Sequence, residues 1–199
     1  MLLTHPIIPV VTLHSVDDVH PTLSALAEGG IMCAEIVFRT DCAAEALALA
    51  IKSFPDMTVG AGTIINRTQC EQALAAGAQF IVSPGFSHDV AEICAQNGVF
   101  YLPGAVTPTE IIAALAHGIN IVKFFPADVY GGVRTIKALS SAFPSVKFVP
   151  TGGVSADNLA EYLANPAVTA VGGSWMMSGD IAENNRQAIQ IAQKVRENL

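Results

Sequence analysis

Residues 119–126 read Ile119-Asn120-Ile121-Val122-Lys123-Phe124-Phe125-Pro126, an apolar, β-branched and aromatic run that a proline closes. Such a run predicts a fully buried strand, in which Ile121, Lys123 and Phe125 share one face. Lysine is almost never fully buried unless it pairs with an opposite charge or has a functional role. Desolvation would favour the neutral form of the Lys123 amine, which is the form that acts as a Schiff-base nucleophile. The alternative is a lysine that extends to the strand end and pairs with a carboxylate.

The composition indicates a single globular unit with a large core. Of the 199 residues, 51% are hydrophobic and only 14% are charged, so many elements must be buried on more than one side. The net charge of −7 argues against a nucleic-acid or anionic-membrane surface. No apolar run approaches the length of about 20 residues that a membrane helix needs.

The ends of the chain and its cysteines favour a cytoplasmic protein. Residues 1–6 carry no basic region and run straight into a predicted strand, so we expect no signal peptide. The four cysteines show neither a CxxC pair nor a zinc-binding spacing. We therefore expect them to be reduced and mostly packed in the core.

Short apolar runs alternate with amphipathic patterns along the chain. The predicted strands are Ile7–Leu13, Met32–Phe38, Thr58–Ala61, Phe80–Ser83, Phe100–Leu102, Ile119–Phe125, Val146–Pro150 and Thr169–Gly172. The predicted helices are Asp17–Glu28, Cys42–Lys52, Arg67–Ala76, Ser87–Gln96, Pro108–His117, Gly132–Ser140, Ser155–Leu163 and Ile181–Val195. Strict alternation implies right-handed βαβ units and a parallel sheet. We predict an α/β fold, one (β/α)₈ TIM barrel over residues 1–199, with an open doubly wound sheet as the alternative.

Active sites of such barrels lie at the carboxyl ends of the strands. The second strand ends in Glu35-Ile36-Val37-Phe38-Arg39, and its alternation turns Glu35 and Arg39 toward the barrel axis. Arg39 would lie at the mouth and Glu35 roughly 13 Å deeper. A carboxylate in a barrel interior is costly unless it is paired or catalytic. Glu35 is therefore either half of a structural ion pair or a general acid/base beside Lys123, and we favour the second interpretation.

Glycines follow several of the other predicted strands. After the third strand, Gly60 and Gly62 would let a ligand approach the backbone, and Thr63 offers a hydroxyl. Ser83-Pro84-Gly85 and Leu102-Pro103-Gly104 are turn sequences, for which a structural role is the simpler interpretation.

Paired glycines close the last two strands, Gly152-Gly153 after the seventh and Gly172-Gly173 before Ser174 in the eighth. Their backbone N–H groups, with the helix predicted to start at Ser155, form the kind of site at which barrels bind phosphate. Two tight glycine turns without a ligand are the alternative.

No other residue competes with Lys123, and no metal site is apparent. Lys52, Lys137 and Lys194 fall in predicted helices, and Lys147 begins the seventh strand at the opposite end of the barrel. The five histidines are scattered without a metal-ligand spacing, so we expect neither a metal nor a cofactor.

Six of these stretches together resemble the 2-keto-3-deoxy-6-phosphogluconate (KDPG) aldolase and 4-hydroxy-2-oxoglutarate (KHG) aldolase family. They are Ala34-Glu35-Ile36-Val37-Phe38-Arg39-Thr40, Val59-Gly60-Ala61-Gly62-Thr63, Ser83-Pro84-Gly85, Val122-Lys123-Phe124-Phe125-Pro126-Ala127, Pro150-Thr151-Gly152-Gly153-Val154 and Gly172-Gly173-Ser174-Trp175. The similarity runs from about Ile7 to the carboxyl end with the stretches in family order, and their combination is specific where a single one would not be.

The resemblance implies a metal-independent class I aldolase, a lyase that cleaves KDPG to pyruvate and D-glyceraldehyde 3-phosphate and also acts on KHG. It assigns the Schiff base to Lys123 and acid/base catalysis to Glu35. It implies that Arg39 and Thr63 hold the pyruvate carboxylate, that Thr151 lies near the substrate hydroxyls, and that the phosphate is held by Gly152, Gly153, Gly173 and Ser174. Pro84, Phe125 and Gly172 are the remaining positions that we expect to bind substrate.

The resemblance also bears on assembly and on specificity. It implies a cytoplasmic homotrimer of the Entner–Doudoroff pathway. Many relatives begin with a helix that covers the bottom of the barrel, whereas this chain has six residues before its first predicted strand. We expect that difference to affect stability or assembly rather than catalysis. Arg39 and Gly172-Gly173-Ser174-Trp175 favour the gluconate-type substrate over its galactonate-type epimer.

Two other classes of function remain open at the level of sequence. A phosphate-binding barrel isomerase or epimerase would use the same glycine loops without a covalent lysine. A non-catalytic subunit that binds a phosphorylated metabolite would need neither Lys123 nor Glu35.

Overall fold

The structure is a computed structural model and describes residues 2–197. Strands and helices alternate throughout this part of the chain. The strands are β1 (Ile7–Val11), β2 (Cys33–Val37), β3 (Thr58–Gly62), β4 (Phe80–Val82), β5 (Phe100–Leu102), β6 (Ile121–Phe124), β7 (Lys147–Pro150) and β8 (Val171–Gly173). The helices are α1 (Val19–Glu28), α2 (Ala43–Ser53), α3 (Arg67–Ala75), α4 (His88–Asn97), α5 (Pro108–Ala116), α6 (Gly132–Ala142), α7 (Leu159–Leu163) and α8 (Ile181–Glu197). Short 3₁₀ turns are η1 (Leu2–Thr4), η2 (Val16–Asp18) and η3 (Trp175–Met177). Within the described residues, no helix combines the length and the apolar character needed to cross a membrane.

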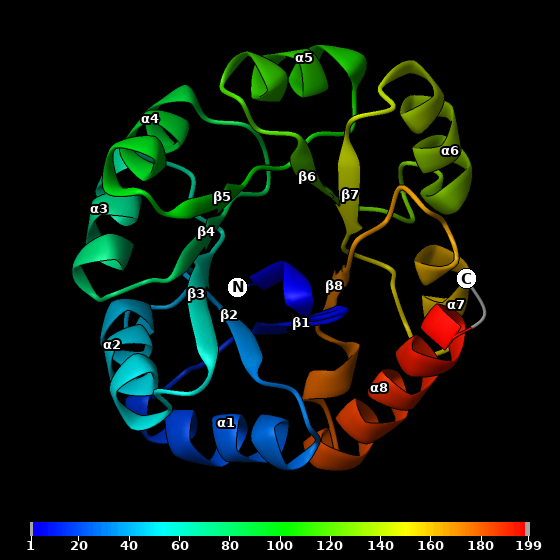
Figure 1. Cartoon of the computed structure of the whole chain (residues 1–199). Helices are drawn as coiled ribbons and strands as arrows, with labels where there is room; N and C mark the ends of the chain where they lie inside the picture. The colour runs from blue at the N-terminus through cyan, green and yellow to red at the C-terminus, as the bar shows by residue number, and fades with distance from the viewer. Residues whose placement is uncertain (1, 198–199) are drawn as a thin grey trace.

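The strands form a closed ring of parallel neighbours. Six are hydrogen-bonded in the order β5-β4-β3-β2-β1-β8, and β6 pairs with β7. Parallel bridges join these two sheets on both sides, Gly104 with Lys123 between β5 and β6, and Thr151 with Gly172 between β7 and β8. Figure 1 shows the ring with the helices around it. The predicted (β/α)₈ barrel is confirmed, and the open sheet is excluded.

Capping side chains fix where several helices begin. Before α5, the Thr107 hydroxyl accepts a hydrogen bond from the Glu110 N–H, the Glu110 carboxylate accepts one from the Thr107 N–H, and Pro108 occupies the first turn. Asn66 and Ser87 cap α3 and α4 with their side-chain oxygens. These caps start the helices within a few residues of the preceding strands, so the loops at the carboxyl end of the barrel are short.

The alternation predicted for β6 decides what lies inside the barrel. Val122 and Phe124 are fully buried, in one apolar cluster with Ile111 of α5 and Ile136 of α6. The opposite face of β6 carries Lys123 toward the barrel axis. The core between strands and helices therefore fixes the orientation of the lysine.

The segment before β1 lies across the amino-terminal end of the barrel. In Figure 1, which looks along the ring, η1 lies inside the circle of strands. Leu2 is buried there in the same apolar cluster as Ile7, Ile8 and Phe80. A single short turn thus adds an apolar side chain to the core at this end of the barrel.

The cysteines are free, and three of them are buried, as expected. The Cys70 and Cys94 sulfurs, on the neighbouring helices α3 and α4, lie 3.9 Å apart. Burial raises the pKa of the Cys33 thiol to about 12, so this side chain behaves as a small apolar residue.

Candidate active site

Lys123 is held rigidly in the wall of the barrel. Its backbone N–H donates to the Pro103 carbonyl at 2.8 Å, and its own carbonyl accepts from the Ala105 N–H at 2.9 Å. Only 6% of the residue is exposed. Its Nζ lies 5.2 Å from the centroid of the Phe125 ring, close enough for a cation–π contact when the amine is charged.

Glu35 faces Lys123 from the other side of the ring. Its strand, β2, lies across the barrel from β6 (Figure 1). The Lys123 Nζ and the Glu35 Oε1 are 3.3 Å apart, and only 2% of Glu35 is exposed. The structure therefore brings together the two residues that the sequence predicts as nucleophile and acid/base.

A stabilising effect alone does not explain the buried contact between Lys123 and Glu35. Removing two charges from water costs about as much as their attraction returns, so a buried ion pair is weak evidence for a stabilising role. A carboxylate within hydrogen-bonding distance of a lysine can instead take the ammonium proton and free the amine for attack. Lys147 offers no such arrangement, because its Nζ donates to the Pro166 carbonyl at the amino end of β7.

Gly62 makes room for the Glu35 carboxylate. A Cβ atom built on Gly62 would collide with Glu35 Oε1. The sequence predicts that the β3 glycines admit a ligand to the backbone, whereas a Cβ on Gly60 would meet the Phe80 ring and one on Gly62 would meet the Glu35 carboxylate. The absence of a side chain at Gly62 therefore leaves space for the Glu35 carboxylate beside Lys123.

A cavity of about 280 Å³ opens at the carboxyl end of the barrel beside this pair. Seven predicted site residues line it: Arg39, Phe125, Thr151, Gly152, Gly153, Gly173 and Ser174. Neither Lys123 nor Glu35 lines it, but Phe125, which does, has its ring centroid 5.2 Å from Lys123 Nζ. The cavity thus lies along the glycine loops, and Phe125 separates it from the buried amine.

Arg39 is an exposed residue in the turn after β2, at the mouth, as predicted. Its Nη2 donates to the Thr12 hydroxyl, which follows β1, at a distance of 3.3 Å. The guanidinium brings a positive charge to a cavity whose other lining residues are uncharged. Any anionic group of a ligand in this cavity would find its charge partner here.

Glycine is required in the first pair by the backbone conformation and in the second pair by neighbouring side chains. Gly152 and Gly153 have φ values of +88° and +74°, which favour glycine. A Cβ on Gly172 would meet the Thr151 hydroxyl, and one on Gly173 would meet the Trp175 ring. Side chains are therefore excluded from these loops, which leaves their backbone toward the cavity.

The helix expected directly after Gly152-Gly153 starts later than predicted. The Ser155 N–H donates to Asn158 Oδ1 at 2.9 Å, and Asn158 Nδ2 donates to the Gly153 carbonyl at 2.8 Å. This turn occupies residues 155–158, and α7 begins only at Leu159 with five residues. The helix therefore starts four residues after the predicted Ser155, although the Leu159 N–H already donates to the Ser155 carbonyl at 3.0 Å.

Thr63 and Pro84 lie near the site without lining the cavity. Thr63 follows Gly62 directly, in the left-handed conformation with φ of +60°. The Pro84 carbonyl packs against Gly104, where a Cβ would collide with it, and Gly104 bridges to Lys123. Pro84 is therefore held beside the strand that carries Lys123, and its role in binding stays a prediction.

The structure also shows residues that are not among the predicted site residues. Val10, Val154 and Trp175 line the cavity. Apolar residues at strand ends resemble core residues, so only the ring order of the strands could have identified them. The structure also joins His88 and His117, whose Nδ1 and Nε2 are 2.9 Å apart. Among residues 2–197, no three histidine, cysteine, aspartate or glutamate side chains are grouped to hold a metal ion.

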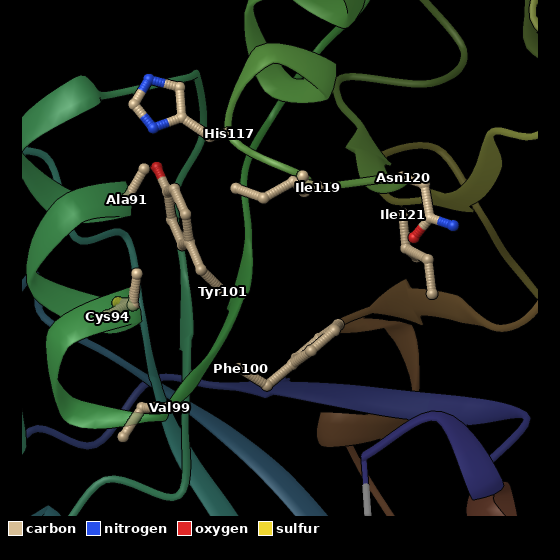
Figure 2. A pocket seen from close by; sticks show the side chains of 11 residues that line it. Ala91, Cys94, Val99, Phe100, Tyr101, His117, Ile119, Asn120 and Ile121 are labelled. Carbon is tan, nitrogen blue, oxygen red and sulfur yellow. The ribbon is translucent and has the colours of Figure 1, made fainter.

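A second cavity, of about 220 Å³, lies against α4 (Figure 2). Phe100 and Ile121, the first residues of β5 and β6, line it, so it lies away from the mouth of the barrel. Tyr101, His117 and Asn120 contribute polar atoms to a mostly apolar wall. None of the predicted site residues lines this cavity, so it takes no part in the chemistry considered below.

Comparison with known proteins supports the arrangement. The chain matches the family described as "Aldolase: KDPG and KHG aldolase" over residues 1–192. It is 51% identical over 171 residues to a 2-dehydro-3-deoxy-phosphogluconate aldolase of Treponema pallidum, covering 86% of this chain and 81% of the relative.

Solved structures show the same fold. The KDPG aldolase of Zymomonas mobilis with 3-phosphoglycerate superimposes with a TM-score of 0.89 at 35% identity, covering 92% of this chain and 90% of that one. The KDPG aldolase of Legionella pneumophila, with pyruvate captured as a covalent carbinolamine, gives a TM-score of 0.87 at 38% identity over 96% and 94% of the two chains.

Proposed function

The chain belongs to the KDPG and KHG aldolase family, and from this premise we propose that it is a class I aldolase that cleaves KDPG to pyruvate and D-glyceraldehyde 3-phosphate. The observation that carries the proposal is the buried contact of 3.3 Å between Lys123 Nζ and Glu35 Oε1, next to Phe125, which lines the cavity. A carbonyl compound bound in that cavity would present its reactive end to an amine with a proton acceptor beside it.

The first half of the reaction makes the imine. Glu35 accepts a proton from Lys123, and the neutral amine attacks the C2 ketone of the substrate to give a carbinolamine. Loss of water then leaves a protonated imine on Lys123. The Legionella relative, in which pyruvate forms a carbinolamine, supports this order of steps.

The second half breaks the C3–C4 bond. Glu35, directly or through a water molecule, accepts the proton of the C4 hydroxyl as the bonding electrons move into the imine. The aldehyde leaves, and the enamine that remains is protonated at C3. Hydrolysis of the resulting imine releases pyruvate and restores the lysine.

Substrate would lie across the mouth of the barrel. Arg39 and Thr63 hold the carboxylate, Thr151 contacts the hydroxyls, and the N–H groups of the Gly152-Gly153 and Gly173-Ser174 loops hold the phosphate. Pro84, Phe125 and Gly172 shape the space between these ends. The Zymomonas relative with 3-phosphoglycerate supports a place for a phosphorylated three-carbon acid in this family.

The remaining attributes follow from family membership. We infer that the enzyme also cleaves KHG, because the family description names both substrates. We further infer a cytoplasmic homotrimer, folded as one domain over residues 1–199, that serves the Entner–Doudoroff pathway.

The direct test of the function is release of pyruvate from KDPG, measured with a coupled lactate dehydrogenase assay. Activity is expected to be the same with and without EDTA, because an imine replaces the metal ion as electron sink. The control is a metal-dependent aldolase, which must lose activity in the same buffer. Loss on chelation that zinc or magnesium restores would favour a metal-dependent mechanism, and absence of pyruvate would favour the isomerase alternative.

The phosphate site is tested at Ser174, the exposed residue of its loops whose side chain lines the cavity. Ser174→Glu places a negative charge where the phosphate is expected, so KM for KDPG should rise by about tenfold or more at low salt. Exchange of the pyruvate methyl protons, which needs no phosphate, should be little changed.

The matched control is Ser178→Glu, an equal change of charge at an exposed serine outside the cavity lining. It should leave KM for KDPG near the wild-type value. If Ser174→Glu slows KDPG cleavage and pyruvate exchange equally, the phosphate does not bind between these loops.

A further inference from the structure

Thr63 has an unusual backbone conformation at the edge of the active site. Its φ of +60° lies in the left-handed region, and no other non-glycine residue among those described has a positive φ. A β-branched residue in this region is a genuine outlier. Such a conformation persists only where the surrounding structure imposes it, and these conformations cluster at functional sites.

Ser83 supplies that surrounding structure. Its hydroxyl donates to the carbonyl of Ile64, the residue after Thr63, at 2.5 Å. The Ile64 N–H in turn donates to the Val82 carbonyl at 3.1 Å. Both polar groups of Ile64 are therefore bonded to the end of β4, one residue beyond the strained position.

Ser83 is itself fixed and enclosed. Its N–H donates to the Leu102 carbonyl at 3.1 Å, which ties it to β5, and only 1% of the residue is exposed. Its hydroxyl also contacts the hydroxyl of the buried Tyr101. A buried hydroxyl with such specific partners has a use beyond forming the turn that the sequence predicts here.

We propose that Ser83 is a positioning residue, whose hydroxyl holds the Ile64 carbonyl and thereby keeps Thr63 in the conformation that presents its side chain to the substrate carboxylate. This inference rests on the proposed function, which gives Thr63 that role. Every substrate of the enzyme shares the 2-keto acid end, so Ser83 governs affinity for pyruvate and for KDPG alike. The phosphate end, held by different loops, is unaffected.

The test is a double-mutant cycle on KM. Ser83→Ala should raise KM for pyruvate in methyl-proton exchange and KM for KDPG by the same factor, about tenfold, the usual effect of one hydrogen bond to a charged group. The value of kcat should change much less. Ser140→Ala, which removes a hydroxyl bonded to the Lys137 carbonyl on the surface of α6, is the matched control and should change neither constant.

The second arm places Ser83→Ala in a Thr63→Val background, which keeps the β-branched shape and removes only the Thr63 hydroxyl. If Ser83 acts through Thr63, Ser83→Ala adds nothing further to KM in that background. Equal, additive effects in both backgrounds, or no effect of Thr63→Val alone, overturn the proposal. Should Ser83→Ala not fold, Ser83→Cys, with a weak donor of similar size, replaces it and should raise KM in the same direction.

A measurement without turnover separates this proposal from the function on which it rests. The backbone ¹³C chemical shifts of Thr63 report its φ and should leave their left-handed values in Ser83→Ala. If they stay unchanged, Ser83 does not hold Thr63, whatever the enzyme cleaves. If they move while the wild-type protein yields no pyruvate from KDPG, the proposed function fails and the structural link stands.

Discussion

Lys123→Met is expected to abolish KDPG cleavage, with kcat falling by about 10⁵-fold, as when a covalent nucleophile is removed from an active site. Methionine fills a similar volume but cannot form an imine, so no electron sink remains for the C3–C4 bond. The measurement is steady-state pyruvate release, together with circular dichroism to show that the barrel is folded.

A structural loss must be separated from a chemical one in that variant. Lys123→Met leaves Glu35 without its partner in the barrel interior, and breaking a buried pair costs about 3–5 kcal/mol of stability. Lys123→Arg keeps a positive charge beside Glu35 but supplies no nucleophile, so it should be equally inactive. Lys147→Met is the matched control, because the Lys147 Nζ donates to the Pro166 carbonyl at the amino end of β7, and it should retain wild-type kcat. Substantial cleavage by folded Lys123→Arg would contradict the assignment.

Glu35→Gln is expected to lower kcat by about 10²–10⁴, the usual contribution of a positioned general acid/base. Glutamine has nearly the same shape as glutamate, so it fits the space that Gly62 leaves, and the barrel should fold. The amide can donate a hydrogen bond to substrate but cannot accept the proton of the C4 hydroxyl. KM should change much less than kcat, because the interaction is made in the transition state.

Pyruvate provides a second readout for the same variant. The group that protonates the enamine also exchanges the methyl protons of pyruvate with solvent, so exchange, followed by ¹H NMR in deuterated water, should slow in parallel with cleavage. Glu45→Gln is a matched control that makes the same change in the first turn of α2. If Glu35→Gln exchanges protons at the wild-type rate, another group carries the proton.

The sequence alone predicts the two ends of the catalytic contact because strand alternation is regular. Glu35 and Lys123 are separated by 88 residues, yet their positions on β2 and β6 direct both to the axis of one ring. The strict alternation of elements was enough to predict that ring. The order of the strands also places the glycine loops of β7 and β8 side by side, where a bridge between Thr151 and Gly172 joins them.

The reasons for the glycines were not accessible from the sequence. Gly62, Gly172 and Gly173 are small because Glu35, Thr151 and Trp175 occupy the space where a side chain would go. These neighbours come from elsewhere in the chain or from the local turn, and a pattern of glycines does not show what fills the space beside them. The sequence therefore predicts glycines at the ends of these strands without the physical reason for them.

The remaining differences between the predicted and the observed structure arise where a side chain forms a hydrogen bond with the backbone. Asn158 delays the start of α7 by bonding to the backbone on both sides of Val154, although the apolar pattern from Ser155 fits a helix. The left-handed conformation of Thr63 depends on the hydrogen bond that the Ser83 hydroxyl donates to the Ile64 carbonyl. These two residues are 19 positions apart in the sequence. No local preference of threonine predicts it.

The central claim, that Lys123 carries the substrate as an imine, is tested most directly by trapping. The enzyme is incubated with pyruvate, the imine is reduced with sodium borohydride, and the digested peptides are examined by mass spectrometry. We expect loss of activity in step with one pyruvate-derived adduct per chain, on the peptide and at the residue Lys123, and none when pyruvate or borohydride is omitted. An adduct on Lys147 or another lysine, or inactivation without any adduct, would contradict the claim.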